Sequence, residues 1–324
     1  MKQLILALAG LALAAPAFAN DSTAETAAGG LVLTQSYSID MLSEDLYVSA
    51  DEIRVRYVFR NQSAEDVRTL VAFPMPIHDL EMERDGDIAF PSDFTTRVDS
   101  GDVPMQSERR ASFEGTDITR LLEEAGVSLM SDDPAWELGS VLDALPAEAQ
   151  QRLIDARAVE VRERRGVRHL QPMWQVSENW YWEQLFPAGE DIVVEHSYHP
   201  GTGGAGDTGL TYAGFAESEW GQQAIADYCI DADFLAGLQR MRSSGRYLAF
   251  GERVLTYILT TGANWRAPIG DFRLVVDKGE PENLVSFCAE GVRKIAPTQF
   301  EVRHQNWRPD RDLRVLVIVP YAGE

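Results

Sequence analysis

The sequence predicts a mainly β protein with an antiparallel β-sandwich architecture, arranged as two sandwich-like regions with two short helical parts. Two observations predict this class. Apolar and polar residues alternate along many short segments, and Gly, Pro, Asn and Asp separate those segments. Strands with one wet face are typical of antiparallel sheets. Helical spacing of apolar residues is confined to an insertion near 116–165 and a segment near 218–241.

The clearest strand covers residues 53–60, where the odd-numbered residues are apolar and three of the four even-numbered ones are arginine. Asn61-Gln62-Ser63 then predicts a turn, and Val67 to Phe73 a returning strand. Further strands are expected in this half at 31–39, 46–48, 80–84, 94–99, 109–113, 174–177, 180–186 and 192–198, the last three as a meander.

Three helices are expected in the insertion, from Asp117 to Gly126, from Asp132 or Asp133 onward, and from Ala147 to about Arg164. The end of the third helix carries a basic cluster, which consists of Arg162, Arg164, Arg165 and Arg168. This cluster is either a docking patch for an acidic partner or a solvated helix end whose cations lie near the negative end of the helix dipole. We favour the second interpretation.

Glycines crowd residues 201–209, which predicts a flexible linker. The expected organisation is therefore an N-terminal domain at 20–200 that contains the insertion, and a C-terminal β-rich domain at 210–324. Helices are expected at 218–228 and 233–241, and strands at 254–260, 272–276, 284–288, 299–303 and 313–319. The last strand is apolar almost throughout, so we expect a central strand that is covered on both faces.

The first residues have the pattern of a signal peptide. Lys2 is followed by an apolar run from Leu4 to Ala15 and by Ala17-Phe18-Ala19, a site that a signal peptidase cuts. The run is shorter than the roughly 20 residues that cross a bilayer. We expect cleavage between Ala19 and Asn20, no transmembrane segment, and a periplasmic or secreted protein.

The chain is acidic, with 29 Lys and Arg against 51 Asp and Glu and a formal net charge of −22. Lys2 is the only charged residue in 1–19, so removal of this leader leaves −23. Nucleic acids bind basic surfaces, and we therefore expect no nucleic-acid partner.

Two cysteines, Cys229 and Cys288, lie in the C-terminal half. In an oxidising compartment an isolated pair predicts a disulfide. A metal site or a redox pair is the alternative, but the sequence has neither a CxxC motif nor a histidine beside these cysteines.

Aromatic residues are the candidate ligand-facing groups. Trp180, Trp182 and Phe186 share one face of an expected strand, and Asn264-Trp265 lies in an expected loop. Exposed, such rings stack on sugars or hold an apolar ligand or a peptide; buried, they belong to the sandwich core. We favour the core interpretation.

The sequence predicts no catalytic residue, no cofactor and no metal site. It lacks the G-x-S-x-G, S-x-x-K and H-E-x-x-H motifs, the P-loop and the dinucleotide fingerprint. His196 and His199 are close in sequence, but residues three apart on a strand point to opposite faces. Paired carboxylates for glycoside cleavage stay open, since their distances in space do not follow from sequence.

Short stretches spread over almost the whole chain carry a resemblance to a known family, namely Asn20-Asp21-Ser22-Thr23-Ala24-Glu25 with Gly29-Gly30-Leu31, Tyr57-Val58-Phe59-Arg60-Asn61, Phe73-Pro74, Phe186-Pro187-Ala188-Gly189, Asn264-Trp265 through Gly270-Asp271-Phe272, and Ser286-Phe287-Cys288. In these stretches the chain resembles the secreted bacterial family described as domain of unknown function 4424. The resemblance implies a secreted bacterial protein, without an activity or a site residue.

Two functional hypotheses follow. The first is a non-catalytic binding or structural protein of the bacterial envelope, which recognises a protein, peptide or glycan partner. The alternative is an envelope hydrolase that uses a carboxylate pair or a metal, for example on glycans. The missing nucleophile motifs favour the first hypothesis, so that we do not expect an enzyme.

Overall fold

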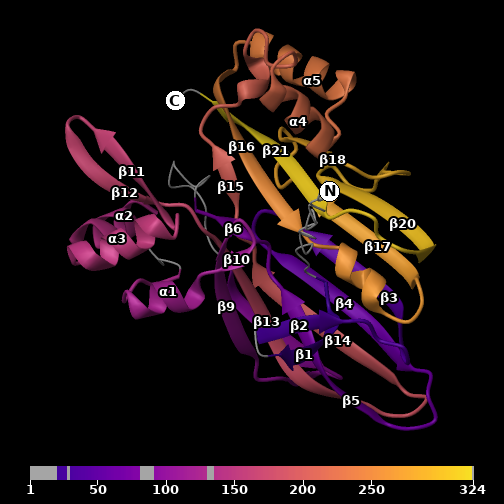
Figure 1. Cartoon of the computed structure of the whole chain (residues 1–324). Coiled ribbons are helices and arrows are strands. Elements are labelled where there is room, and N and C mark those ends of the chain that lie inside the picture. The colour runs from indigo at the N-terminus through magenta and orange to yellow at the C-terminus, as the bar shows by residue number, and fades with distance from the viewer. Residues whose placement is uncertain (1–19, 28–29, 81–90, 130–134, 323–324) are drawn as a thin grey trace, which may run out of the picture.

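The computed structural model describes residues 20–27, 30–80, 91–129 and 135–322 and is mainly β, as predicted (Figure 1). The expected signal peptide at 1–19, most of the strand expected at 80–84 and the expected helix start at Asp132 or Asp133 lie outside the described residues.

The largest sheet has eight strands and takes them from both halves of the chain. Its alternation matches the sequence pattern, because Ile53, Val55, Tyr57 and Phe59 are buried while the arginines between them face solvent. One neighbouring pair, β17 and β3, is parallel. The strand order is β19 (Arg293–Lys294), β20 (Gln299–Trp307), β17 (Ile269–Asp277), β3 (Ile39–Val48), β4 (Ile53–Asn61), β14 (Asp191–His199), β7 (Ser92–Val98) and β8 (Gly101–Asp102).

A second sheet of seven strands belongs to the N-terminal half. Its path runs β10 (Thr116–Asp117), β9 (Gln106–Phe113), β13 (Gln175–Phe186), β5 (Val67–Pro74), β1 (Ser22–Ala27) and β2 (Gly30–Thr34), and β6 (His78–Asp79) also pairs with β13.

The meander expected at 174–198 is wrong. Residues 175–186 form one continuous strand, β13, and the next strand, β14, belongs to the eight-stranded sheet instead of pairing with β13. The connection turns at Gly189, whose φ is 72° and whose N–H donates to the carbonyl of Asn61. Alternating burial is the same for strands in one sheet or in two, so the pattern of residues did not reveal the change of layer.

The third sheet has four strands, β15 (Gly203–Ala205), β16 (Tyr247–Tyr257), β21 (Leu313–Ala322) and β18 (Leu284–Phe287). Strand β21 is central and covered on both faces, as predicted. Val315 and Val317 pack into the main core, whereas Leu316 and Ile318 contact the layer formed by α4 (Glu219–Tyr228) and α5 (Ala232–Ser243). Short 3-10 helices η1 (Gly209–Thr211) and η2 (Thr260–Asn264) flank this region.

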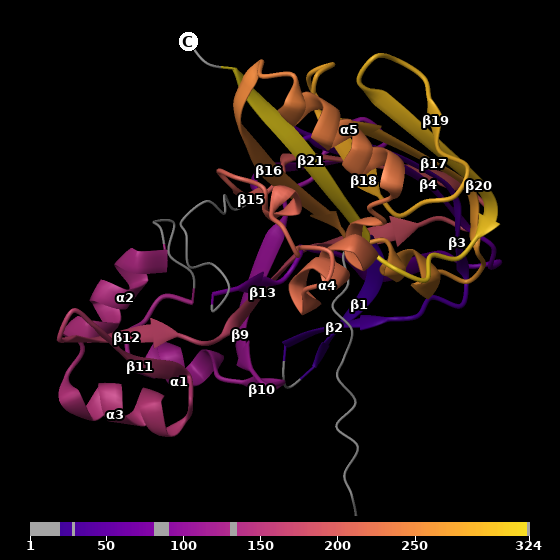
Figure 2. The same cartoon turned by 90° about the horizontal axis from the view of Figure 1, so that it is seen from above.

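The helical insertion lies to one side of the sandwich in both views (Figure 1, Figure 2). It contains α1 (Thr119–Glu124), α2 (Ala135–Ala144), α3 (Ala147–Asp155) and a hairpin of β11 (Val159–Arg164) and β12 (Val167–Pro172). These elements share a separate core that includes Leu122, Leu142, Leu153, Leu170 and Trp174.

The third helix is shorter than predicted, because it ends at Asp155 instead of near Arg164. Arg157 has a φ of 59°, and the N–H of Ala158 donates to the carbonyl of Leu153 across this left-handed turn, which closes the helix. The predicted arginine cluster therefore lies on and beside the hairpin, and its interpretation as a solvated helix end is wrong.

The main core joins all three large sheets. Buried side chains on one face of the eight-stranded sheet pack both against Phe73 and Phe186 of the seven-stranded sheet and against Leu255 and Val317 of the four-stranded sheet, while the opposite face carries the exposed arginines of β4. The eight-stranded sheet is thus a shared layer of one extended sandwich. Residues 201–209, expected as a linker, include β15, which pairs with β16. The division into domains 20–200 and 210–324 stays a prediction.

Candidate functional site

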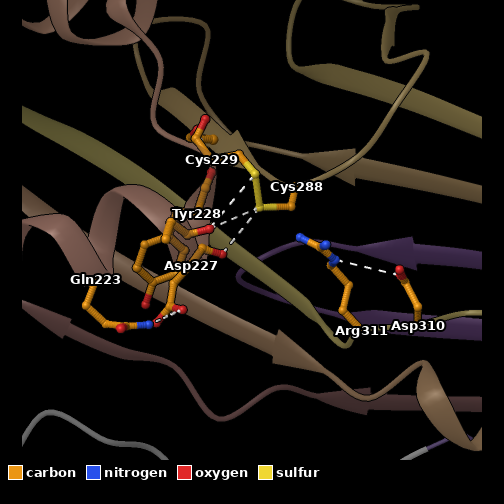
Figure 3. The surroundings of a disulfide bond; sticks show 9 residues. Gln223, Asp227, Tyr228, Cys229, Cys288, Asp310 and Arg311 are labelled. Atoms are coloured by element: carbon orange, nitrogen blue, oxygen red, sulfur yellow. Dashed lines mark hydrogen bonds and ion pairs between the residues drawn. A yellow bond between two sulfur atoms is a disulfide. The ribbon is translucent and has the colours of Figure 1, made fainter.

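A disulfide joins Cys229 to Cys288, with an S–S distance of 2.07 Å, as expected (Figure 3). Cys229 ends α4 in a left-handed conformation with a φ of 50°, and Cys288 directly follows β18. A hydrogen bond of 2.8 Å from the Ser286 hydroxyl to the Tyr228 carbonyl lies beside the bridge. The helical layer is therefore fastened to the end of the four-stranded sheet.

A groove of about 460 Å³ opens beside this disulfide, and Figure 3 shows Cys288 on one side with Asp310 and Arg311 on the other. Its volume lies in the range of small-molecule sites in proteins. The groove has an apolar floor made from strand residues of two sheets and the segment after β16, namely Leu259, Phe272, Leu274, Val302 and Leu313.

Aromatic rings form one wall of the groove. The ring of Trp307 lies 4.4 Å from that of Phe272 and 5.1 Å from that of His304, measured between centroids. Both Trp307 and His304 are half-buried, so the wall is held by packing and remains partly accessible. An aromatic wall over an apolar floor suits a ligand with an aliphatic or aromatic body.

Charged side chains line the rim. Asp312 is already engaged, because its Oδ1 accepts hydrogen bonds from the backbone N–H groups of Leu259 and Thr260 and from the Thr260 hydroxyl. Arg308 donates to the Ala263 carbonyl over 2.9 Å. Arg311 is 65% exposed and its Nε lies 3.7 Å from Asp310, a loose ion pair that leaves donors for an anion.

The candidate ligand-facing aromatic residues lie elsewhere, inside the sandwich, where the favoured core interpretation placed them. Trp182 is 3% exposed and donates to Gln184, while Trp265 is fully buried and donates from Nε1 to the Asp21 carbonyl over 2.7 Å. Trp180 is half-buried and stacks on Phe94, with centroids 5.4 Å apart.

Asn264 likewise turns inward, because its Nδ2 donates to the Ser22 hydroxyl over 3.0 Å. The structure brings none of the four predicted residues to the groove. His304 and Trp307 were not among the candidates, and the strand expected at 299–303 is too short to include them, although β20 continues to Trp307.

His196 and His199 point to opposite faces of β14, as expected from strand geometry. His196 is buried, whereas the side chain of His199 is 64% exposed. Among the described residues, no group of three or more His, Cys, Asp and Glu side chains is arranged to hold a metal ion.

His196 instead belongs to a buried polar cluster between the eight-stranded and the seven-stranded sheet. One ring nitrogen lies 2.8 Å from the Thr96 hydroxyl and the other 3.1 Å from Oδ1 of Asp21. This chain of contacts from a hydroxyl to an imidazole to a carboxylate resembles a catalytic triad, in which these groups act as nucleophile, general base and orienting acid. All three residues are at most 3% exposed, so a substrate has no access and the cluster connects the layers.

Burial dominates the electrostatics of this cluster. It raises the pKa of Asp21, an effect that the interaction with His196 opposes. It also raises the pKa of Glu44 to about 8, although Asn20 donates a hydrogen bond to this carboxyl group over 3.0 Å.

A second hollow, of about 560 Å³, lies on the outer face of the eight-stranded sheet and is lined by Arg54, Arg56, Arg97 and Arg273. These arginines are paired within the protein, for example Arg54 with Glu52 at 2.9 Å and Arg273 with Asp45 at 3.0 Å. Since these arginines already pair with carboxylates of the protein, we consider this face a less suitable ligand site than the groove.

The fold and the groove define a β-sandwich protein with a ligand-sized groove beside a disulfide. The sequence profile of the family described as Domain of unknown function (DUF4424) matches residues 19–316, so the chain belongs to this family, as the resemblance implied. No curated protein matches the chain.

Among solved structures, the chain is similar to a protein of Legionella pneumophila subsp. pneumophila str. Philadelphia 1 that is described as a candidate nutrient binding protein. The identity is 15%, the TM-score is 0.46, and the match covers 93% of this chain and 70% of that one. Within the described parts of the chain, no helix is long and apolar enough to cross a membrane.

Proposed function

We propose that this protein is a non-catalytic binding protein of the bacterial envelope and that the groove beside the Cys229–Cys288 disulfide holds its ligand. The observation that carries this proposal is the combination of an apolar floor, an aromatic wall and exposed rim charges in a hollow of about 460 Å³. Sites of this composition bind small molecules or the side chains of peptides, because burial of the apolar part supplies affinity and a few polar groups orient the ligand.

The apolar floor and the exposed guanidinium group of Arg311 fit a ligand with an apolar body and one anionic group, whereas Glu290 and Asp310 in the same lining would repel a second negative charge. The body would lie on Leu274 and Val302 and against the ring of Trp307. The anionic group would face Arg311, whose side chain is 65% exposed. A peptide with a hydrophobic side chain and a carboxylate has this chemistry, and a glycan without an apolar part lacks it.

The envelope location rests on the leader pattern and on the disulfide, which is stable in an oxidising compartment. The alternative of an envelope hydrolase gains no support from the buried Thr96–His196–Asp21 arrangement, since substrates do not reach it.

The probe that tests this proposal is 8-anilinonaphthalene-1-sulfonate, which combines an apolar ring system with a sulfonate. We expect the folded protein with an intact disulfide to bind it with a rise in fluorescence. Trp307→Ala removes the aromatic wall and Arg311→Ala removes the rim cation, so that each variant should bind about tenfold more weakly, equivalent to 1.4 kcal/mol.

Trp220→Ala is the matched control, because Trp220 is 60% exposed and lies outside the groove. Its affinity for the probe should equal that of the unmodified protein. Equal binding by all three variants, with circular dichroism showing that they are folded, would place the probe elsewhere and refute the groove as the ligand site.

A further inference from the structure

The residues that directly follow the predicted cleavage site are buried in the centre of the fold. Asn20, Asp21 and Ser22 are all 0% exposed. The strand that begins at Ser22, β1, is paired on both sides, with β2 and β5. Chain termini usually lie at the surface, so this burial requires a specific explanation.

These residues also connect separate parts of the sandwich. Asp21 contacts His196 of the eight-stranded sheet through its side chain and Trp265 through its carbonyl. Asn20 donates to Oε2 of Glu44 over 3.0 Å. The side-chain amide of Asn20 is also close to η2, since a Cβ on Gly262 would lie 3.0 Å from it.

The site holds more acceptors than donors. Three buried oxygen atoms of these residues have no hydrogen-bond partner, namely Asn20 Oδ1, Asp21 Oδ2 and Glu44 Oε1. No Lys or Arg of the described residues pairs with Asp21 or Glu44. Buried acceptors without donors, and buried carboxylates without a cation, are strongly destabilising.

A buried cation with several N–H donors would satisfy these oxygen atoms. We propose that cleavage between Ala19 and Asn20 supplies it, and that the new α-ammonium group of Asn20 forms buried ion pairs with Glu44 and Asp21 that stabilise the processed protein. The inference goes beyond the ligand groove and rests on the expected signal peptide.

The chemistry of processing supplies this group. Hydrolysis breaks the peptide bond between the carbonyl carbon of Ala19 and the nitrogen of Asn20; water adds its hydroxyl to the carbonyl, and the released amine is protonated near neutral pH. The backbone nitrogen and Nδ2 of one asparagine are within roughly 5 Å of each other by covalent geometry. Since Nδ2 lies 3.0 Å from Oε2 of Glu44, the α-ammonium group lies within roughly 8 Å of this oxygen, and rotation about the first bonds of the freed terminus can bring it nearer.

The test compares two forms of the whole 20–324 chain. One begins at Asn20, released from a fusion partner by a protease that leaves no added residue, and the other keeps a Gly-Ser extension whose peptide bond replaces the ammonium group. We expect the free form to melt at least about 5 °C higher.

Glu44→Gln separates charge pairing from steric effects of the extension. It should lower the melting temperature of the form with free Asn20, because the ammonium group loses its partner. In the extended form it should leave the melting temperature unchanged or raise it, because there is no ammonium group to lose and a buried carboxyl group without a cation partner disappears.

Glu301→Gln is the matched control, because Glu301 is also buried but pairs with Arg273 and Arg293, far in sequence from residue 20. Its effect should be the same in both forms. An equal effect of Glu44→Gln in both forms would overturn the proposal.

A second measurement does not depend on the variants. An amine-specific acetylating reagent should modify the α-amine of the free form slowly while the protein is folded and rapidly after denaturation, as read by peptide mass spectrometry. Rapid modification in the folded state would overturn the proposal. So would an exported protein whose amino terminus is not Asn20, a result that leaves the groove proposal unaffected.

Discussion

At the scale of the residue, Glu44 shows how strongly the fold can perturb one group. The residue is 1% exposed, its Oε1 has no hydrogen-bond partner, and burial raises its pKa to about 8. The nearby charge of Asp21 acts in the same direction. In a chain that still carries residues ahead of Asn20, Glu44 is therefore protonated at neutral pH.

This shift predicts the pH dependence of stability for the chain with an amino-terminal extension. The folded pKa of about 8 lies above the ordinary 4.5, so the folded state binds more protons than the unfolded state between these values. The contribution of Glu44 to the free energy of unfolding should be fully present below about pH 4.5 and should decrease as the pH rises toward 8. Urea unfolding of the extended chain at intervals across this range measures the decrease.

Glu44→Gln provides the comparison, because the amide has no charge to bury. The difference in unfolding free energy between the extended Glu44 chain and this variant should change by a few kcal/mol over the same interval. A difference that is independent of pH would show that Glu44 does not titrate with a raised pKa.

Single residues also mark the limit of what the sequence predicts about the site. The pattern predicted the opposite directions of His196 and His199, because strand geometry alone decides them. It favoured the core for Trp265 but did not reveal the contact that holds this side chain there, since that contact involves Asp21, which is 244 residues away. Contacts between distant segments are not encoded in local periodicity.

At the scale of the element, the ends of helices and strands explain the main errors. Helix α3 ends at Asp155, and the left-handed residue that closes it is Arg157, where a glycine is the usual signal. Strand β20 continues past Arg303 through polar residues to Trp307, so the aromatic wall of the groove was overlooked. The disulfide needed only the cysteine count and the expected compartment, and it was predicted.

The disulfide allows a prediction at this scale, because it fastens α4 to the end of β18 across a separation of 59 residues. Replacing both cysteines by serine should reduce the free energy of unfolding by up to about 4 kcal/mol, the chain-entropy value for a loop of this length. Urea unfolding monitored by circular dichroism measures the loss. The same variant should bind 8-anilinonaphthalene-1-sulfonate more weakly, since Cys229 and Cys288 line the groove.

The control is the unmodified protein treated with dithiothreitol, which breaks the same bond without changing the sequence. Both samples should lose similar stability. A variant as stable as the oxidised protein would mean that packing alone holds α4 on the sheet.

At the scale of the whole molecule, the eight-stranded sheet decides how the two halves of the chain depend on each other. Residues on both sides of 201–209 contribute strands to it, and they meet at the parallel pair β3 and β17. The same core contains Phe73 of the N-terminal half and Val317 of the C-terminal half. Local patterns predicted the strands and the sandwich class, whereas this pairing of distant strands required the structure.

The shared sheet predicts that the processed chain unfolds in one cooperative transition, because separation of the halves would expose the edge of β3 and much of the core.

Gly270→Ala tests the junction of the two halves, the β3–β17 pair, directly. A Cβ at Gly270 would lie 2.4 Å from the backbone oxygen of Leu42, which cannot be accommodated without moving the β3–β17 pair. Differential scanning calorimetry should show the entire transition shifted to lower temperature. Gly206→Ala, where no atom lies within 4 Å of the added carbon, should leave it unchanged. Two separate transitions, only one of which responds to Gly270→Ala, would instead support independent domains at 20–200 and 210–324.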